Sequence, residues 1–399
     1  MDLLAAAAAL QPDIVALRRR LHRRPEIGLE LPETQRAVLD ALDGLPLRIG
    51  TGTAVTSVVA VLDGVARAAR CCCAATWTRC RCPRTPDSTF ASEVPGAMHA
   101  CGHDTHVAML VGAARLLAER RRELPGRVIL MFQPGEEGWG GARLMLDEGL
   151  LDTAGGAVDS AHALHVTTHY ATGVVAVHRG PAMAASDTLR IVVHGRGGHA
   201  SNPSEALDPI PVACAIVQAI QTMVTRRVSV FDPAVVTIAR IAAGTTDNVI
   251  PETAEMLGTM RTLSEGNRAR VKEQLHQLVP SIAAAHGTTA ELTIQEGYPV
   301  TVNADTAADL VHCVTTDLLG AGRALLERDP VMGAEDWSYV LQRVPGSMAF
   351  LGACPPGLEP GQVPANHSNR VVFDEDAMAV GVATHVGVAL AALARGPTG

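Results

Sequence analysis

Two short segments of this chain carry side chains that suit a hydrolytic metal centre. Residues 99–106 read His-Ala-Cys-Gly-His-Asp-Thr-His, which places the thiol of Cys101 two positions before the imidazole of His103. Further along, the adjacent carboxylates Glu136 and Glu137 follow an apolar run at 128–132. Thiolate, imidazole and carboxylate groups are common ligands of catalytic metal ions. The pattern therefore predicts a site where metal activates water for hydrolysis.

The spacing of apolar residues around these segments predicts alternating helices and strands. We expect helices at 14–24, 32–45, 104–123 and 140–151, and strands at 53–62, 128–132 and 348–354. Asp104 or Thr105 could cap the third helix. Strands that alternate with helices favour a largely parallel sheet, and such sheets bind ligands beyond the carboxyl ends of their strands. Glu136 and Glu137 would lie at such an end.

The middle of the chain follows a different order, strand-helix-strand-strand-helix-strand, which is typical of a ferredoxin-like domain. Its expected elements are strands at 189–194, 235–242, 254–262 and 291–295 and helices at 206–224 and 265–285. We therefore predict an α/β protein with two domains: a mostly parallel-sheet catalytic domain and an inserted ferredoxin-like α+β domain. The predicted boundaries are 1–183 and 297–399 for the catalytic domain and 184–296 for the insert.

Composition favours an enzyme that acts on a small molecule. A length of 399 residues with 47% hydrophobic content can form two cores, and a net charge of −8 argues against nucleic acid or an anionic membrane as a partner. We see no apolar stretch of roughly 18 residues that would span a membrane. The basic cluster 18–20 follows the first apolar run, whereas a secretory signal needs its charge first. Of nine cysteines, those outside 71–82 are scattered, so we expect a reduced cytoplasmic protein.

Seven short motifs of this chain resemble motifs of the M20 family of metallopeptidases and amidohydrolases, and they occur in the family's order. The resemblance is to the branch that contains hippurate hydrolases, N-acyl-amino-acid amidohydrolases and auxin-conjugate hydrolases. Any one motif alone would be weak, but the ordered set spans nearly the whole chain and is highly specific. The motifs are Met-His-Ala-Cys-Gly-His-Asp at 98–104, Gly-Glu-Glu-Gly at 135–138, Ala-Leu-His-Val at 163–166, Gly-Gly-His-Ala-Ser at 197–201, Thr-Asp-Asn-Val-Ile-Pro at 246–251, Gly-Ala-Glu-Asp at 333–336 and Asn-His at 366–367.

The resemblance implies that the catalytic domain is zinc-peptidase-like and holds a dinuclear metal site, and it assigns the residues of that site. The implied ligands of two divalent metal ions are Cys101, His103, Glu137, His165 and His367. Glu136 is then the proton shuttle, because one carboxylate must remain free to take a proton from the attacking water. Thiolate and imidazole ligands favour zinc, and carboxylates also admit manganese or cobalt. The implied reaction is cleavage of an N-acyl amino acid at its amide bond, with a dipeptidase or carboxypeptidase activity as the alternative.

The inserted domain is expected to contribute to the substrate site. His199 resembles a lid histidine that stabilises the tetrahedral oxyanion, often from a partner subunit, so the resemblance also implies a homodimer. Asn248 and Arg261 resemble groups that hold the carboxylate of the substrate. Glu335 and Asp336 match a motif that lines the site, and we assign them no catalytic role.

Each of these residues also has a simpler interpretation. Taken singly, Cys101 would be a buried apolar residue, and Glu136 and Glu137 would be solvated loop acids. His199 could be only a residue of a Gly-rich turn, and Arg261 could pair with a surface acid. Because the motifs occur together and in the family's order, the sequence favours a metal site formed by the implied ligands. For the flanking histidines His99, His106, His162 and His169 we expect supporting or surface positions.

One segment, 65–89, departs from the family pattern. The family has a strand that ends in Asp-Met-Asp-Ala-Leu-Pro, whereas residues 71–82 read Cys-Cys-Cys-Ala-Ala-Thr-Trp-Thr-Arg-Cys-Arg-Cys. This stretch lacks the Val, Ile and Leu expected of a buried parallel strand, so we expect no strand there. A small zinc site is an alternative, but the cysteine spacing contains no Cys-x-x-Cys pair.

The genetic code offers a better explanation of this segment. If each codon begins one base earlier, residues 72 and 73 must become Leu-Leu and the step from Trp77 to Thr78 must give Asp. The neighbouring steps permit Val-Leu-Leu-Arg-Gly-Asp-Met-Asp-Ala-Leu-Pro throughout. We hypothesise a compensated frameshift that opens near Gly64 and closes before Phe90. Because the family's Asp at this strand end is expected to orient a metal ligand, the chain as written should have poor stability and low activity, and a catalytically impaired relative is a further alternative.

Overall fold

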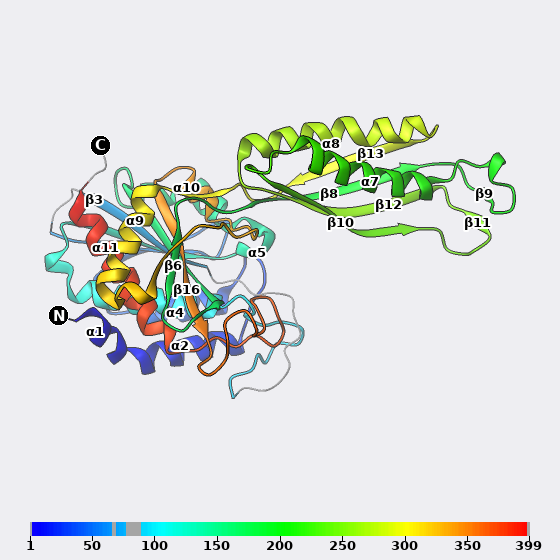
Figure 1. Cartoon of the computed structure of the whole chain (residues 1–399). Helices are drawn as coiled ribbons and strands as arrows, with labels where there is room; N and C mark the ends of the chain where they lie inside the picture. Colours follow the sequence, from blue (N-terminus) through cyan, green and yellow to red (C-terminus); the bar gives the residue numbers. More distant parts are fainter. Residues whose placement is uncertain (1, 66–68, 77–88, 397–399) are drawn as a thin grey trace. The chain divides into compact units, whose positions relative to one another are not determined.

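The computed structural model describes residues 2–65, 69–76 and 89–396, which form two compact units (Figure 1). Unit 1 comprises Met1–Ala182, Val302–Asp329 and Asp336–Gly399, and unit 2 comprises Met183–Thr301 and Pro330–Glu335. Unit 2 therefore extends beyond the predicted boundary at 296. It also includes 330–335, because Met183 forms a β-bridge with Val331 and the Ala184 N–H donates to the Val331 carbonyl.

Unit 1 contains a mixed sheet of eight strands in the order β1-β2-β4-β3-β5-β16-β6-β15. Its centre is parallel, since β3 pairs in parallel with β4 and β5, and β5 pairs in parallel with β16. The strands are β1 (Leu47–Thr51), β2 (Val58–Asp63), β3 (Ala69–Thr76), β4 (Gly126–Gln133), β5 (Ser160–Ala171), β6 (Val175–His178), β15 (Ala324–Glu327) and β16 (Gly346–Cys354); β7 (Gly180–Met183) and β14 (Thr301–Asn303) form a separate pair. The predicted α/β fold class is confirmed.

Helices cover the sheet of unit 1 and bury an aliphatic core. They are α1 (Leu3–Ala9), α2 (Gln11–Arg23), α3 (Pro32–Leu42), α4 (His103–Glu119), α5 (Glu136–Trp139), α6 (Gly141–Asp147), α9 (Asp305–Leu319), α10 (Ser338–Leu341) and α11 (Ala377–Arg395), with short 3-10 turns at Arg121–Glu123, Leu150–Asp152 and Ala321–Arg323. Apolar residues of α4 and α11 form one cluster with alternate residues of β3 and β4.

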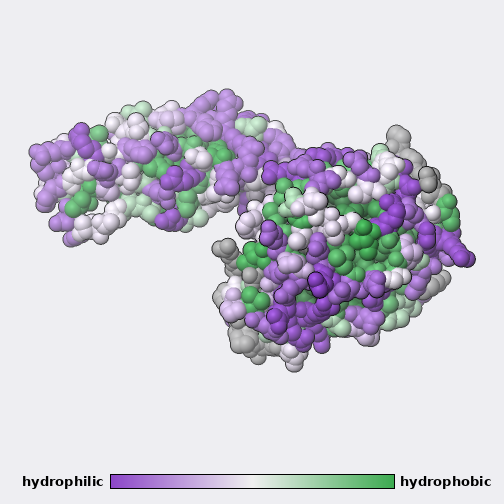
Figure 2. Space-filling model, turned by 180° about the vertical axis from the view of Figure 1, so that it is seen from behind, coloured by the Kyte–Doolittle hydropathy of each residue, from purple (hydrophilic) through white to green (hydrophobic). Residues whose placement is uncertain are grey.

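Helix α11 corrects one sequence expectation. It is 19 residues long and apolar enough to cross a membrane by length and composition, although we expected no such stretch. Its most apolar window is 78% buried inside the structure, so it is a core helix of unit 1. Figure 2 shows hydrophilic residues interspersed with smaller hydrophobic areas over the visible face of the molecule.

The unusual cysteine segment forms the central strand β3. Cys71 lies opposite Val128 of β4 and Ser160 of β5, and every residue of β3 except Arg70 is buried. The expectation that no strand forms was therefore wrong for Ala69–Thr76. Cysteine and alanine are small apolar residues that proteins readily bury, and the two neighbouring strands supply the pairing that the local sequence pattern does not reveal. The expected aspartate at position 78 lies outside the described residues.

Unit 2 has the predicted ferredoxin-like arrangement, with an antiparallel sheet in the order β10-β12-β8-β13 and two helices packed against it. Its elements are β8 (Ala185–His194), α7 (Pro209–Arg227), β10 (Ala234–Ala243), β12 (Thr253–Thr262), α8 (Glu265–Ala285) and β13 (Thr289–Glu296). Beyond the ends of β8 and β12, a short pair of strands joins β9 (Gly198–His199) to β11 (Val249–Ile250), and a 3-10 turn follows at Pro203–Glu205.

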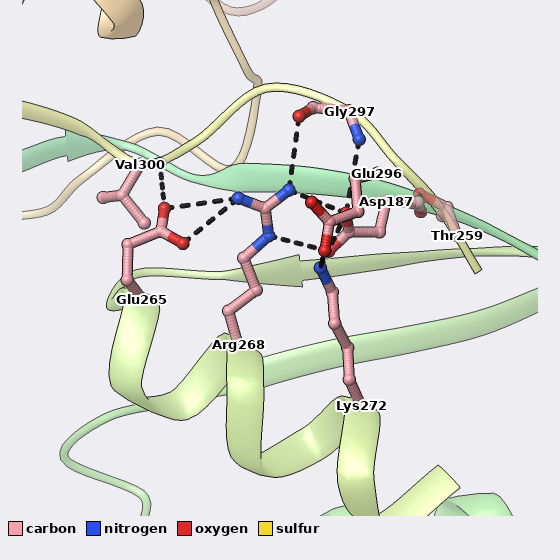
Figure 3. A network of polar contacts seen from close by, with 8 residues as sticks. All are labelled: Asp187, Thr259, Glu265, Arg268, Lys272, Glu296, Gly297 and Val300. Carbon is pink, nitrogen blue, oxygen red and sulfur yellow. Dashed lines mark hydrogen bonds and ion pairs between the residues drawn. The ribbon is translucent and has the colours of Figure 1, made fainter. Parts of the chain in front are cut away.

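A buried network of ion pairs joins the start of β8, helix α8 and the segment that follows β13 in unit 2 (Figure 3). Asp187 at the start of β8 accepts two hydrogen bonds from Arg268 of α8, at 2.9 and 2.7 Å, and lies 3.4 Å from Lys272. The Gly297 N–H also donates to Asp187. Glu265 accepts the Val300 N–H, so α8 is tied to the segment that leaves the sheet. Asp187 and Arg268 are 2% and 6% exposed, which makes this an ion pair that water barely screens.

Removing the charge of Asp187 should destabilise unit 2. We expect Asp187→Asn to cost about 3 kcal/mol, because Arg268 would keep its buried charge without its main partner. Hydrogen exchange of β8 amides in urea measures this free energy locally. Glu255→Gln is the matched control on the same sheet: its partners Arg190 and Arg240 are exposed, so its cost should stay below about 1 kcal/mol.

The same carboxylate should give unit 2 an acid-dependent stability. Burial alone would raise the pKa of Asp187, but the hydrogen bonds and charge of Arg268, with Lys272, hold it below its ordinary value. A pKa lower in the folded than in the unfolded state stabilises the fold at pH above the unfolded value of about 3.9, and this contribution is lost as pH falls through the folded value. Equal acid sensitivity of wild type and Asp187→Asn would contradict this account.

Candidate metal centre

The two adjacent glutamates follow the end of β4, in a turn whose backbone favours glycine. Gly135 has a φ of 70°, a left-handed conformation that strains residues with a side chain, and a Cβ there would also force Cδ2 of Leu29, 2.4 Å away, to move. The turn leaves the strand at the sheet's carboxyl edge, where the sequence placed these acids. Glu136 is buried, whereas Glu137 is partly exposed.

The Cys-Gly-His segment forms a second tight turn, at the start of α4. Gly102 has a φ of 81°, and a Cβ there would lie 2.3 Å from Cγ1 of Val166, so glycine lets Cys101 and His103 approach β5. Helix α4 begins at His103 with Gly102 at its N-cap, and neither Asp104 nor Thr105 caps it as expected.

His165 and His367 reach the same place from β5 and from a loop near the end of the chain. The Nδ1–H of His165 donates to the Val166 carbonyl at 2.7 Å, which leaves Nε2 as a lone-pair donor 3.4 Å from Cys101 Sγ. His367 has the left-handed φ of 70°, uncommon for a residue with a side chain. Its Nε2 lies 3.2 Å from Cys101 Sγ and 3.1 Å from Glu137 Oε1.

Three overlapping groups of potential ligand atoms therefore lie together in unit 1, each with its atoms within 4.8 Å of one another. They are Cys101 with His103 and His165, Cys101 with Glu137 and His367, and His103 with Glu136 and Glu137. The first two groups share Cys101, an arrangement that fits two neighbouring cations around one thiolate. Burial lowers the pKa of His165 to about 4, so this imidazole is in the neutral form that binds metal. The donor set fits a pair of divalent metal ions.

A layer of hydrogen bonds supports these side chains. Asn366 donates to the carbonyls of Val166, at 3.0 Å, and of Cys101, at 3.3 Å. Val166 is the residue whose carbonyl orients His165, and its N–H donates to Nε2 of His106 at 2.9 Å. The ring of His106 packs edge-on against that of His165, with centroids 4.5 Å apart. His106 is thus a buried supporting residue, as expected.

We expect Asn366→Ala to weaken metal binding by about 10- to 100-fold, because Val166 and Cys101 lose the amide that joins them. Competition with a chelator of known affinity measures the change. Gln362→Ala, in the exposed part of the same loop, is the matched control and should bind metal as the wild type does. Unchanged affinity in Asn366→Ala would show that the backbone alone holds the two ligands.

Sequence reasoning missed the residues that anchor the start of α4. Asp104 is fully buried and accepts from Arg18 Nε at 3.1 Å, and its Oδ2 lies 2.8 Å from His22 Nδ1. Burial opposes its charge, yet Arg18 and His22 together hold the pKa of Asp104 well below its usual range. Arg18 also pairs with Glu375 at 2.8 Å. From the sequence, the basic run at 18–20 indicated only that the N-terminus is not a secretory signal. It lies far from Asp104 in the sequence, so no local pattern predicted that the two are in contact.

Asp336 has a structural role in unit 1. It accepts from Gln133 Nε2 at 2.6 Å and from the Ala142 N–H at 2.9 Å, so it joins the end of β4 to α6 on either side of the two glutamates. Of the other histidines, His162 is buried against Ser347, His99 is buried and His169 is exposed.

In unit 2 the structure brings together two of the three predicted substrate residues. His199 and Asn248 line one hollow of about 430 Å³, with 197–198 and 249–252. Arg261 lies near the opposite end of β12, opposite Ser186, while the hollow lies beyond Thr253. Eight residues of strand separate these ends by on the order of 25 Å. Burial lowers the pKa of Arg261, and the charge of Asp187 opposes this shift.

Comparison with known proteins agrees with this geometry. The family model described as Peptidase family M20/M25/M40 matches residues 81–391. The chain is 37% identical to thermostable carboxypeptidase 2 of Saccharolobus solfataricus, with 94% of each chain covered. It is 34% identical to the IAA-amino acid hydrolase ILR1-like 4 of Arabidopsis thaliana, with 94% of this chain and 84% of the relative covered.

A solved structure gives the same result. The Bacillus subtilis YXEP protein, described as a dinuclear metal binding peptidase from the M20 family, superposes with a TM-score of 0.82 at 30% identity, over 96% of this chain and 98% of that one. The sequence resemblance, the fold and the clustered ligands thus lead to one conclusion: the chain belongs to the M20 peptidase family, whose members here are metal-dependent hydrolases of amide bonds.

Proposed function

We propose that this protein hydrolyses N-acyl amino acids, releasing a carboxylic acid and an amino acid. The observation that carries the proposal is the convergence of Cys101, His165 and His367 with the two glutamates of the Gly-Glu-Glu-Gly turn. The relative named as an IAA-amino acid hydrolase supports an acyl amino acid as substrate.

The chain's own residues define the proton path. Divalent metal ions, when bound, would polarise the amide carbonyl and lower the pKa of the attacking water; we propose zinc, with manganese or cobalt as alternatives. Glu136 takes the proton from this water as the oxygen of the water bonds to the carbonyl carbon. As the C–N bond breaks, Glu136 returns a proton to the leaving nitrogen, so it ends the cycle as a carboxylate.

The residues of unit 2 support a homodimer. Hydrogen-bond donors of His199 and Asn248 suit the oxyanion and the substrate carboxylate, and the guanidinium of Arg261 also suits a carboxylate. Yet Arg261 lies on the order of 25 Å from the hollow of the same unit, which exceeds the size of an acyl amino acid. We propose that Arg261 and His199 serve one substrate only when they come from two different subunits.

A carboxypeptidase activity is the second candidate, because one of the compared relatives is named as a carboxypeptidase. Both reactions cleave a secondary amide whose leaving group is an amino acid with a free carboxylate. They differ in the acyl side, which carries an amino group in a dipeptide and none in a benzoyl or acetyl substrate. A catalytically impaired relative is the third candidate, motivated by the altered segment at 65–89.

A substrate panel on the metal-loaded full chain tests the proposal. We expect N-benzoyl, N-acetyl and indole-acetyl amino acids to be cleaved faster than dipeptides. Capping the substrate carboxylate as an amide should lower kcat/KM by at least about 100-fold, because donors placed for a carboxylate would be left unpaired. Chelation should abolish turnover, and added zinc or manganese should restore it. Faster cleavage of dipeptides would favour the second candidate, and full metal occupancy without any hydrolysis would favour the third.

A further inference from the structure

The loop that carries His199 is held in place by its own main chain. His199 lies opposite Val249 in the short β9 and β11 pair. The Ala200 N–H donates to the Asn248 carbonyl at 3.1 Å, and the Asn202 N–H donates to the His199 carbonyl at 2.8 Å. The backbone on both sides of His199 is therefore fixed relative to Asn248, although the side chain of His199 is exposed.

Ser201 makes two contacts with one ring nitrogen of His199. Its backbone N–H donates to Nδ1 at 3.1 Å, and its hydroxyl oxygen lies 2.9 Å from the same atom. A peptide N–H can only donate, so Nδ1 must be the unprotonated nitrogen of a neutral imidazole. The ring proton is then on Nε2, which has no hydrogen-bond partner within the described part of the chain. A proton on Nδ1 would instead point at the Ser201 N–H.

We propose that Ser201 is a positioning residue that fixes His199 in the Nε2–H tautomer, so that this ring presents a hydrogen-bond donor in the hollow it shares with Asn248. The inference rests on the proposed function, in which His199 stabilises an anionic oxygen of the substrate. Such an oxygen requires donors, and the other tautomer would present a lone pair at Nε2 and repel it.

The tautomer can be measured without any turnover. In the full chain labelled with 15N-histidine, long-range 1H–15N spectra distinguish the two tautomers, and His199→Gln identifies the signals of this ring. At a pH where the ring is neutral, we expect the pattern of the Nε2–H tautomer in the wild type. Ser201→Ala should show a measurable population of the Nδ1–H form, because only the backbone donor remains. An Nδ1–H pattern in the wild type, or identical patterns in both proteins, would overturn the proposal.

Kinetics connects the tautomer to the reaction. Ser201→Ala should lower kcat about fivefold, as expected for the loss of one exposed hydrogen bond, with KM within about twofold of the wild type. Ser201→Thr keeps both donors and should restore kcat. Ser204→Ala, in the exposed turn nearby, is the matched control and should leave kcat unchanged.

A double variant separates the tautomer from a general loop effect. Glutamine at position 199 offers an N–H donor but has no tautomer, so in the His199→Gln background Ser201→Ala should have no further effect. A further fivefold loss there would mean that Ser201 only supports the loop. If the spectra show the Nε2–H tautomer but His199→Gln and His199→Ala both keep full activity, the role assigned to His199 in catalysis fails while the tautomer assignment stands.

Discussion

Replacing Glu136 with glutamine is expected to lower kcat by about 10³-fold while metal content stays at the wild-type level. Glutamine has the shape of glutamate but cannot accept and return a proton. Glu136 is only 6% exposed, and its Oε2 lies 3.9 Å from His103 Nε2, so the carboxylate stands beside a predicted metal ligand. Turnover of an N-acyl amino acid, measured together with metal analysis of the same sample, checks both parts of this expectation.

The adjacent residue provides the control. Glu137 belongs to two of the three ligand groups and contacts His367 at 3.1 Å. Glu137→Gln should therefore lose metal as well as activity, whereas Glu136→Gln should lose activity alone. If both variants lose metal equally, the two carboxylates share one role and the assignment of Glu136 as proton shuttle is wrong.

The clustering of the predicted ligands could be anticipated only because the motifs occurred together. Cys101 and His103 alone, or His165 within an apolar strand, are more often core or surface residues than ligands. The order of the motifs identified these residues as ligands, which no single residue could do. The ferredoxin-like unit was predicted separately, from the order of its strands and helices. In α8, for example, buried residues recur every three or four positions.

Contacts between distant segments could not be predicted in this way. Arg18 and His22 reach Asp104 across more than 80 residues of chain, and no local pattern encodes that pairing. Helix α11 was not predicted for a different reason. Its residues are apolar on nearly every face, so it lacks the amphipathic period that reveals a helix.

Strand β3 is the clearest case in which three-dimensional context outweighs local sequence. It lacks the Val, Ile and Leu expected of a buried parallel strand, so the sequence predicted no strand there. Nevertheless β4 and β5 pair with it on both sides. The strand ends at Thr76, whose hydroxyl lies 3.4 Å from Nδ1 of His106. Because His106 Nε2 accepts the Val166 N–H, Nδ1 carries the proton and donates, over a distance typical of a weak hydrogen bond. The shifted reading frame permits an aspartate at position 76.

Replacing residues 65–89 with the shifted reading should therefore raise both stability and activity. Once their neighbours repack around them, leucines at 72 and 73 would add buried apolar groups worth about 3 kcal/mol together, which corresponds to a rise in Tm of about 5–10 °C. An aspartate at 76 would give His106 a charged acceptor, and through Val166 this contact would hold His165 more firmly. We expect kcat/KM to rise by at least about tenfold.

Two partial replacements separate these effects. The pair Cys72→Leu and Cys73→Leu should raise Tm with little change in metal affinity, while Thr76→Asp should tighten metal binding with little change in Tm. Thr76→Asn, which has nearly the same shape as the aspartate but no charge, is the matched control and should give a smaller gain in affinity. If the full replacement lowers Tm and leaves kcat/KM unchanged, the present residues are adapted to their neighbours, and the frameshift hypothesis loses its physical support even though the codons permit it.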